Sequence, residues 1–161
     1  MKTLLILAMI VATAAADQIT KLAVLRSLSP GEVHAVSPGF NLTLGFNEGA
    51  SFGMMSDFMA GRPLLMVALT GALAIIFAGM AFRADTRREG IGLALIVGGA
   101  VGNIIDRLRQ GAVTDFLDVY WRDWHWPTFN GADIAISLGA LLVLTAMLRP
   151  SRSKELSFDR T

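Results

Sequence analysis

Uncharged apolar stretches recur along the chain and restrict its fold more than any other feature. Four of them occupy residues 3–16, 64–82, 90–105 and 134–148. Only 17% of the residues are charged and 53% are hydrophobic, whereas soluble domains carry roughly 25% charged residues. Because about 20 helical residues cross the core of a bilayer, these stretches predict an α-helical polytopic membrane protein.

The length of each predicted span depends on the polar residues at its ends. The first helical pattern runs on through Asp17 and Lys21, which are spaced i, i+4 and can pair on one helix face. The second opens near Pro63, which suits a first helical turn. The third and fourth reach membrane length when their polar ends are embedded. We therefore predict a single membrane domain of residues 1–161 with spans at about 3–22, 63–82, 90–107 and 131–148.

The distribution of Lys and Arg predicts the orientation, because cytoplasmic loops carry an excess of both. One side holds Lys2, Arg83, Arg87, Arg88, Arg149, Arg152, Lys154 and Arg160, and the other holds Arg26, Arg62, Arg107, Arg109 and Arg122. The first side carries more, so both termini are placed in the cytoplasm. The loops at about 27–61 and 108–128 then face outward, and the polar tail at 150–161 is cytoplasmic.

The first span has an alternative interpretation as a cleavable secretory signal. Lys2, the apolar run and the segment TAAAD fit that pattern. Three further spans and the Asp17–Lys21 spacing favour a helix that continues instead. An N-terminus at Asp17 in the purified protein would overturn the interpretation as four spans.

Charge and composition exclude several classes of function. A net charge of +1 offers no basic face for nucleic acid. The absence of cysteine excludes disulfides and thiolate metal sites. His34 and His125 are far apart in the sequence, and neither belongs to an HExxH pattern. We therefore expect no metal, no cofactor and no nucleic-acid partner, and nothing in the sequence requires more than a monomer.

The two outward loops carry different patterns. In the first, PGFNLTLGF alternates apolar and polar residues, which predicts a strand in a small sheet on the membrane surface. Its expected apolar face comprises Phe40, Leu42, Leu44 and Phe46. The second loop contains Tyr120, Trp121, Trp124 and Trp126. Tryptophan and tyrosine concentrate at the headgroup level of membranes, so interfacial anchoring is the role we expect for the tryptophans.

Polar residues gather at the outward ends of several segments, where ionisable groups are costly and indicate function. They are Asp17, Lys21, Asn47, Asn103, Asp106, Arg107, Asp115, Asn130 and Asp133. The small residues of GGAVGN permit close helix contact, so we expect Asp106 and Arg107 to bind the facing helix ends. Asp118 and Asp123 lie among loop aromatics, and we expect both to be solvated.

Asp115 and Asp133 have a different expected role. Asp115 precedes Phe116 and Leu117, an apolar stretch that should approach the membrane, and Asp133 opens the fourth span. Two carboxylates that face each other share a proton. One can then activate water as a base while the other, protonated, polarises a carbonyl. This predicts peptide hydrolysis without a metal; the alternative for Asp133 is that it simply caps its helix.

Five motifs extend this prediction in order along most of the chain. They are DQITK at 17–21, NEGASFG at 47–53, GGAVGNIIDR at 98–107, VTDF at 113–116 and FNGAD at 129–133. Each is weak alone, but together with four apolar spans they are specific. On these motifs the sequence resembles lipoprotein signal peptidase (signal peptidase II), the aspartyl peptidase family A8 of the bacterial inner (cytoplasmic) membrane.

The resemblance implies a fold, a substrate and a set of residues. The fold would be four transmembrane helices with a small periplasmic β-cradle and a short periplasmic helix, and the active site would lie on the periplasmic side. The substrate would be a diacylglyceryl prolipoprotein, cleaved before its lipidated cysteine in contact with membrane lipid, and globomycin-type cyclic peptides would inhibit. Asp115 and Asp133 match the catalytic pair. Asp17, Lys21, Asn47, Gly49, Asn103, Arg107, Asn130 and Ala132 match the other positions around the active site.

The motifs depart from the family in two places. Gly131 stands where the family more often has a larger apolar residue, and Ser51 stands where alanine is common. Neither is one of the two aspartates. Gly131 is expected to loosen the start of the fourth helix by about 1 kcal/mol, the usual glycine penalty.

Two other classes of function compete with the interpretation as a peptidase. A small transporter with a proton relay would carry polar residues along the length of a helix, but residues 64–82 contain only Thr70 of that kind. A non-enzymatic assembly factor would tolerate conservative loss of Asp115 or Asp133, which an enzymatic assay can test.

Overall fold

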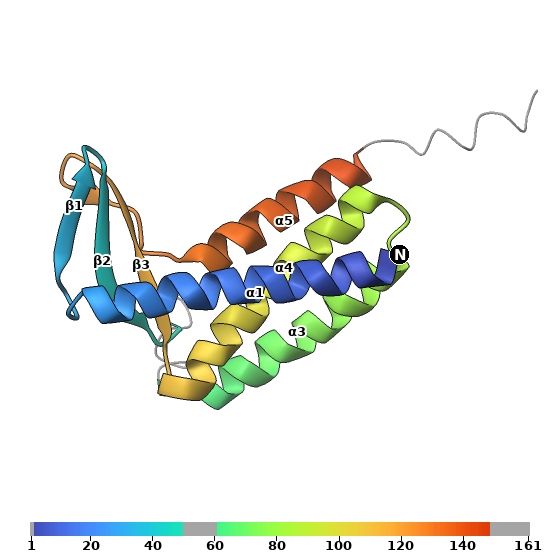
Figure 1. Cartoon of the computed structure of the whole chain (residues 1–161), viewed down its shortest axis with the longest axis horizontal. Helices are drawn as coiled ribbons and strands as arrows, with labels where there is room; N and C mark the ends of the chain where they lie inside the picture. Colours follow the sequence, from blue (N-terminus) through green and yellow to red (C-terminus); the bar gives the residue numbers. More distant parts are fainter. Residues whose placement is uncertain (1, 50–60, 149–161) are drawn as a thin grey trace, which may run out of the picture.

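The computed structural model describes residues 2–49 and 61–148, which form long helices with a small sheet at one end (Figure 1). The helices are α1 (Lys2–Ser27), α3 (Pro63–Arg83), α4 (Arg87–Gln110) and α5 (Gly131–Met147). The strands are β1 (Val33–Ser37), β2 (Phe40–Asn47), β3 (Val113–Trp121) and β4 (Trp124–His125). We call the end of the helices next to the sheet the sheet end; α1 and α4 both finish there, and α5 begins there.

The helices confirm the class of fold. By length and composition α1, α3 and α4 can each cross a membrane. Helix α5 is also apolar but is shorter, with 17 residues. Helix α1 continues past Asp17 and Lys21 to Ser27, as the i, i+4 spacing predicted. The short additional helix implied by the resemblance is not among the helices of the described residues, and positions 50–60 and the tail from 149 lie outside them.

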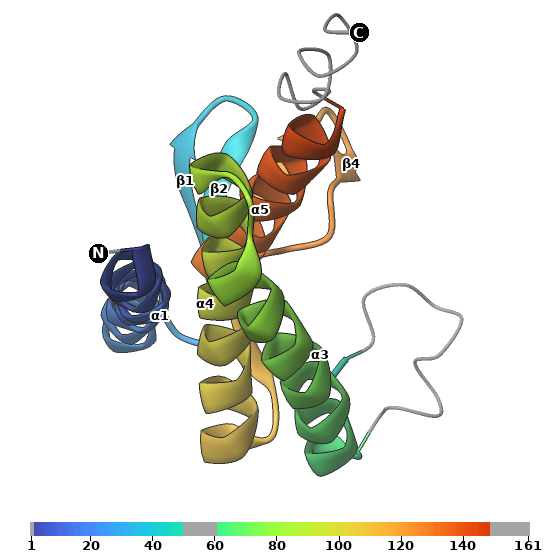
Figure 2. The same cartoon turned by 90° about the vertical axis from the view of Figure 1, so that its right-hand side faces the viewer.

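Helix α4 is the central helix of the bundle and packs against α1, α3 and α5 (Figure 2). Glycines allow this close packing, as the GGAVGN segment predicted. A Cβ on Gly92 would lie 2.7 Å from the Gly139 carbonyl oxygen of α5, and one on Gly98 would lie 2.6 Å from Thr13 Cβ of α1. Small residues let helix backbones approach closely where lipid gives no hydrophobic driving force.

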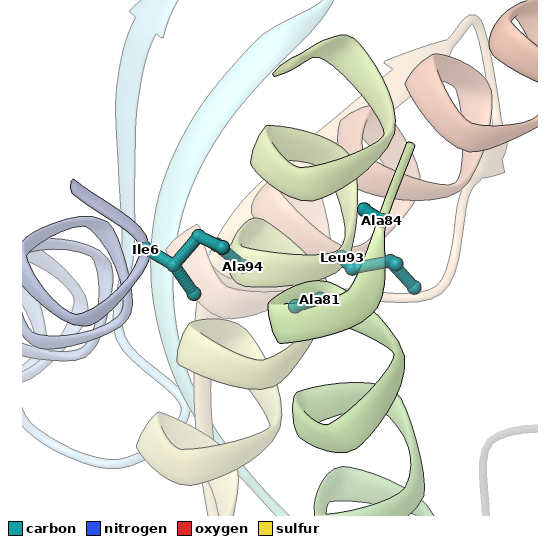
Figure 3. Close-up of a cluster of buried hydrophobic side chains, with 5 residues drawn as sticks. All are labelled: Ile6, Ala81, Ala84, Leu93 and Ala94. Carbon is teal, nitrogen blue, oxygen red and sulfur yellow. The ribbon is translucent and has the colours of Figure 1, made fainter. Parts of the chain in front are cut away.

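A small apolar cluster joins three helices at the end opposite the sheet. It consists of Ile6 of α1, Ala81 of α3, Ala84 at the end of α3, and Leu93 and Ala94 of α4 (Figure 3). Large apolar side chains instead point outward along the bundle, among them Ile75, Leu144 and Leu4. This pattern is the reverse of a soluble protein, and it suits helices whose outer surface faces lipid.

The sheet is antiparallel, with the strand order β1-β2-β3-β4. Strand β2 occupies residues 40–47, as its alternation predicted. Strand β3 was not anticipated. Gly111 ends α4 in the left-handed conformation, with φ of 81°, and the chain then enters β3 directly. This short connection brings Asp115 to the sheet end of α4.

The predicted faces of β2 require a correction. The pairing with β3 shifts by one residue between Leu42 and Gly45, so Thr43 and Leu44 together oppose one residue of β3. Such a bulge reverses the alternation of side chains beyond it. Leu44 is buried while Phe46 is exposed, and Asn41 is buried. The four apolar residues therefore do not form the single apolar face expected from the sequence.

The tryptophans at the end of β3 and beyond it are exposed. Trp121, Trp124 and Trp126 are each more than half exposed, and the rings of Trp124 and Trp126 meet edge to face at 5.8 Å. Exposed tryptophans at one end of an apolar bundle are compatible with the anchoring role expected for them.

Candidate active site

Asp115 lies in the middle of a hydrogen-bond network at the sheet end. The residue belongs to β3 and is only 2% exposed. Its Oδ1 accepts a hydrogen bond from Asn130 Nδ2 at 2.6 Å, and its Oδ2 accepts one from Asn47 Nδ2 at 3.0 Å. Each oxygen keeps a second lone pair, so the carboxyl can still take up a proton in this setting.

Asp133 has two partners that explain its position at the start of α5. Asn130 caps that helix, and its side chain accepts a hydrogen bond from the Asp133 backbone N–H at 3.1 Å. In return Asp133 Oδ2 accepts one from the Asn130 N–H at 3.1 Å, which completes a capping box. Asp133 Oδ1 accepts a further bond from Asn103 Nδ2 at 3.1 Å. The capping alternative is therefore correct for one oxygen, while the other is directed into the polar network.

Two asparagines connect the two carboxylates. Asn130 Nδ2 lies 3.3 Å from Asn103 Oδ1 as well as within bonding distance of Asp115. Asn103 in turn donates to Asp133. Both amides are buried, at 0% exposure for Asn130 and 8% for Asn103. The structure thus brings Asp115 and Asp133 into one network, close enough for the charge of Asp133 to act on Asp115.

Burial gives Asp115 an unusual proton affinity. It raises the pKa of Asp115 to about 6, since a charged carboxylate loses its hydration there; the hydrogen bonds from Asn47 and Asn130 limit the rise, and the charge of Asp133 adds to it. A pKa near 6 lets the group exchange protons close to neutral pH, as general acid–base chemistry requires.

Lys21 anchors the network to α1. Its Nζ lies 2.8 Å from Asp17 Oδ2 and 3.0 Å from Asp106 Oδ2, and it donates to Asn103 Oδ1 at 2.9 Å. The lysine is only 1% exposed. A buried charge is tolerated only when it is paired and hydrogen-bonded, and here the lysine fixes the amide that reaches Asp133.

Asp17 and Asp106 extend this anchor to the neighbouring elements. Asp17 Oδ1 accepts a hydrogen bond from the backbone N–H of Ala132 at 2.9 Å, which ties α1 to the first turn of α5. Asp106 Oδ2 accepts one from the Thr114 N–H at 3.0 Å. This bond ties α4 to β3 at the residue that precedes Asp115. The structural role predicted for Asp106 is confirmed. Its partner is Lys21, with no ion pair to Arg107 among the described residues.

Arg107 lies at the edge of the network. Its Nη1 donates to the Asn103 carbonyl oxygen at 3.5 Å, and its charge acts on Asp115, Asp133 and Asp106. Its Nε is buried without a hydrogen-bond partner in the part of the chain that the structure describes. Arg107 therefore supplies positive charge close to the carboxylates. This role goes beyond the contact with facing helix ends that the sequence predicted.

Gly49 positions Asn47. Its N–H donates to Asn47 Oδ1 at 2.8 Å, so the Nδ2 group of Asn47 is turned toward Asp115. Gly49 has φ of 107°, a conformation that side-chain-bearing residues rarely adopt. The motif from position 50 onward, including Ser51, lies outside the described residues. A Cβ added to Gly131 would lie 3.5 Å from Asp17 Oδ1, an ordinary contact distance, so the backbone here leaves room for a Cβ.

The prediction that Asp118 is solvated is wrong. Asp118 is 5% exposed. Asn41 Nδ2 donates to its Oδ2 at 2.9 Å, and His125 Nδ1 lies 2.8 Å from its Oδ1. Burial alone would raise the pKa of Asp118, but the hydrogen bonds from Asn41 and His125 outweigh it, and the pKa lies below its ordinary value. Asp123 is exposed, as expected.

Three contributors to the site were missed from the sequence. Gln18 Nε2 donates to Asp106 Oδ1 at 2.9 Å and to the Gly102 carbonyl oxygen at 3.1 Å. Thr114 is fully buried and accepts a bond from Gln110 Nε2 at 2.7 Å. Gln18 and Thr114 directly adjoin Asp17 and Asp115, so the signal was their place inside the polar motifs. Gln110 carried no comparable signal.

A cavity of about 540 Å³ opens beside Asp133. Asn47, Asp133 and Ser137 contribute polar groups to its wall, and Trp126, Phe129 and Leu138 are among its apolar residues. A largely apolar cavity with a few convergent polar groups is typical of ligand sites. Among the described residues no group of three His, Asp or Glu side chains is arranged to hold a metal ion.

Comparisons with known proteins agree with this geometry. The family described as "Signal peptidase (SPase) II" matches residues 9–149. A lipoprotein signal peptidase of Burkholderia mallei (strain SAVP1) is 45% identical over 137 residues, which are 84% of this chain and 82% of that protein. One of Geobacter metallireducens is 45% identical over 138 residues, covering 84% and 85%.

Solved structures show the same fold. A bacterial membrane enzyme determined by the in meso method at 1.9 Å resolution superposes with a TM-score of 0.78 at 27% identity, covering 91% of this chain and 94% of that one. A second, at 2.3 Å, gives 0.80 at 26% identity, covering 96% and 94%. With the match along nearly the whole length, this chain belongs to the signal peptidase II family, the lipoprotein signal peptidases.

Proposed function

We propose that this protein removes the signal peptide from diacylglyceryl-modified prolipoproteins by cutting before the lipidated cysteine, with Asp115 and Asp133 as its catalytic pair. The observation that carries the proposal is the network in which Asn130 and Asn103 join these two buried or half-buried carboxylates. The family membership supplies the reaction class. Asp133 supplies an acid–base group in the wall of the cavity of about 540 Å³, and the network joins Asp115 to it.

The raised pKa of Asp115 is the basis on which we assign the two roles. Asp115, with its pKa raised to about 6, holds the shared proton and donates it to the oxygen of the scissile carbonyl. Asp133 acts as the base and takes a proton from the attacking water. The tetrahedral intermediate then collapses: Asp133 returns its proton to the departing cysteine nitrogen, and Asp115 recovers one from a hydroxyl of the intermediate. No metal or covalent enzyme intermediate takes part.

The apolar bundle accounts for the lipidated substrate. The site lies at the sheet end, where α1 and α4 finish and α5 begins. Apolar residues such as Leu138 and Ile134 line the cavity below Asp133 on α5, which suits acyl chains that remain in the bilayer. The peptide then reaches the aspartates from the membrane surface, beneath the sheet.

The membrane placement is part of the proposal. Four helices cross the bacterial inner membrane at about 3–22, 63–82, 90–107 and 131–148, with both termini cytoplasmic. The sheet end faces the periplasm, since the opposite end carries more Lys and Arg. Helix α5 crosses when Asn130 and the residues before it lie at headgroup level. Globomycin-type peptides are expected to occupy the cavity, and a monomer contains the complete site.

Signal-peptide release from a purified diacylglyceryl prolipoprotein tests the catalytic pair. Asp115→Asn and Asp133→Asn keep shape and hydrogen bonding but cannot exchange the proton, so each is expected to lower turnover by at least about 10³-fold. Asp123→Asn is the matched control, because that residue is exposed and outside the network. Normal turnover by either of the first two variants, with a Tm close to wild type, rules out the pair.

A further inference from the structure

A second cavity, of about 300 Å³, lies at the end of the bundle opposite the sheet, far along the helices from the aspartates. It forms between the first turns of α1 and of α4. Leu5, Ile6 and Met9 line it from α1, and Gly90 and Ile91 line it from α4. A Cβ on Gly90 would lie 3.7 Å from Ile6 Cδ1, within contact distance, so α1 and α4 approach each other closely at this groove.

Two cations stand at this otherwise apolar cavity, one from each helix. Lys2 belongs to α1 and Arg87 to α4. Within residues 2–49 and 61–148 neither forms an ion pair. Lys2 Nζ donates to the Ala84 carbonyl oxygen, which leaves further N–H groups of the ammonium available. Arg87 presents a guanidinium, whose fork of donors suits a phosphate.

The neighbouring acids do not neutralise this pair. Glu89 accepts a hydrogen bond from the Asp85 backbone N–H. Glu89 and Asp85 line a separate cavity together with Arg83. Positive charge therefore prevails at the mouth of the groove, above an apolar floor.

We propose that this groove binds one anionic phospholipid of the cytoplasmic leaflet, with its phosphate against Lys2 and Arg87 and an acyl chain along Leu5, Met9 and Ile91. Basic pockets between membrane helices on the cytoplasmic side recognise anionic headgroups in this way. The proposal uses the membrane placement given above and is independent of the peptidase chemistry. The bound lipid holds the starts of α1 and α4 together next to the cluster around Ile6 and Leu93.

A lipid titration on the full-length protein in detergent tests the site. The delipidated protein is titrated with phosphatidylglycerol or phosphatidylcholine, and thermal unfolding and native mass spectrometry are recorded. A ligand that binds the folded state raises Tm with its concentration, here by about 4 °C well above Kd. Phosphatidylglycerol is expected to give this rise and one retained lipid, and phosphatidylcholine neither.

Paired variants separate a site from general surface charge. Lys2→Gln with Arg87→Gln removes both cations of the groove, and Arg83→Gln with Arg88→Gln removes the same charge from the same end but outside it. The first pair is expected to lose the phosphatidylglycerol-dependent rise and the retained lipid, and the second to keep both. Equal losses in the two pairs, or equal stabilisation by phosphatidylcholine, overturns the proposal. Arg87→Gln alone repeats the measurement should the Lys2 variant fold poorly. None of these readouts depends on peptidase activity.

Discussion

Asp115 and Asp118 occupy the same strand, yet their environments make them chemically opposite. Both are buried, and each accepts a hydrogen bond from an asparagine of β2. Burial raises the pKa of Asp115 to about 6, and the charge of Asp133 adds to the rise. Asp118 instead meets His125, and its pKa is lowered. The loss of hydration therefore dominates at Asp115, whereas at Asp118 the hydrogen bonds from Asn41 and His125 outweigh it.

The bulge in β2 allows Asn41 and Asn47 to reach different aspartates of β3. Asp115 and Asp118 point to opposite faces of β3, because successive strand residues alternate. Asn41 and Asn47 would share one face in a regular strand. The extra residue between Leu42 and Gly45 turns them to opposite faces, so one strand serves both aspartates.

Deleting Thr43 should have the largest effect, because it removes the bulge that separates Asn41 from Asn47. The deletion restores regular pairing, which turns Asn47 to the face of Asn41 and away from Asp115. We expect turnover to fall by about 10³-fold, since the hydrogen bond to Asp115 is lost and the strand beside the site is displaced. Thr43→Ala keeps the residue count and should stay within about threefold of wild type. Comparable turnover by the deletion variant would show that the bulge does not position the site.

Removing each asparagine side chain separately should show which aspartate takes part in the reaction. Asn47→Ala takes one donor from Asp115 and is expected to lower turnover by up to about 100-fold, as for a hydrogen bond to a charged group. Asn41→Ala takes the equivalent donor from Asp118. It should lower Tm while leaving turnover within about threefold. Prolipoprotein cleavage and thermal unfolding of both variants distinguish the roles, and an equal loss of turnover would place Asp118 in the chemistry.

The smallest of the expected effects is the difference between Asp115 and Asp118 in how each makes stability depend on pH. The folded-state pKa of Asp115 lies above its unfolded value of about 3.9, so its contribution is fully present below about pH 4 and is lost as pH rises through about 6. The loss is at most about 3 kcal/mol, or a few degrees in Tm. The lowered pKa of Asp118 acts in the opposite sense, with stability present above about pH 3.9 and lost as pH falls further.

Thermal unfolding between about pH 4 and pH 7 separates these two contributions. Asp115→Asn is expected to remove part of the decline in Tm that the wild type shows across this range. Asp118→Asn should leave that decline in place, because its own effect falls at lower pH. A wild-type curve that Asp115→Asn does not change would contradict the raised pKa of Asp115.

Much of the fold and site could be predicted because the relevant patterns are local. Apolar stretches located the helices, and alternation located β2 at residues 40–47. The i, i+4 spacing of Asp17 and Lys21 predicted a pair that the structure shows at 2.8 Å. Strand β3 was missed because Asp115 and Asp118 lie on opposite faces of the strand. Neither face therefore shows the unbroken apolar alternation that predicts a strand.

The sequence by itself determined that the chain is an apolar helical protein, that its polar residues gather at one end, and that Asp115 and Asp133 are candidates for a shared site. Tertiary structure alone decided that Asp118 is buried, that a bulge turns Asn47 toward Asp115, and that Lys21 reaches Asn103. The physical reason is the separation along the sequence between the groups that interact. Helix and strand periodicity follows from neighbouring residues, whereas each of these polar contacts joins side chains far apart in the chain, whose meeting depends on how the helices and the sheet pack.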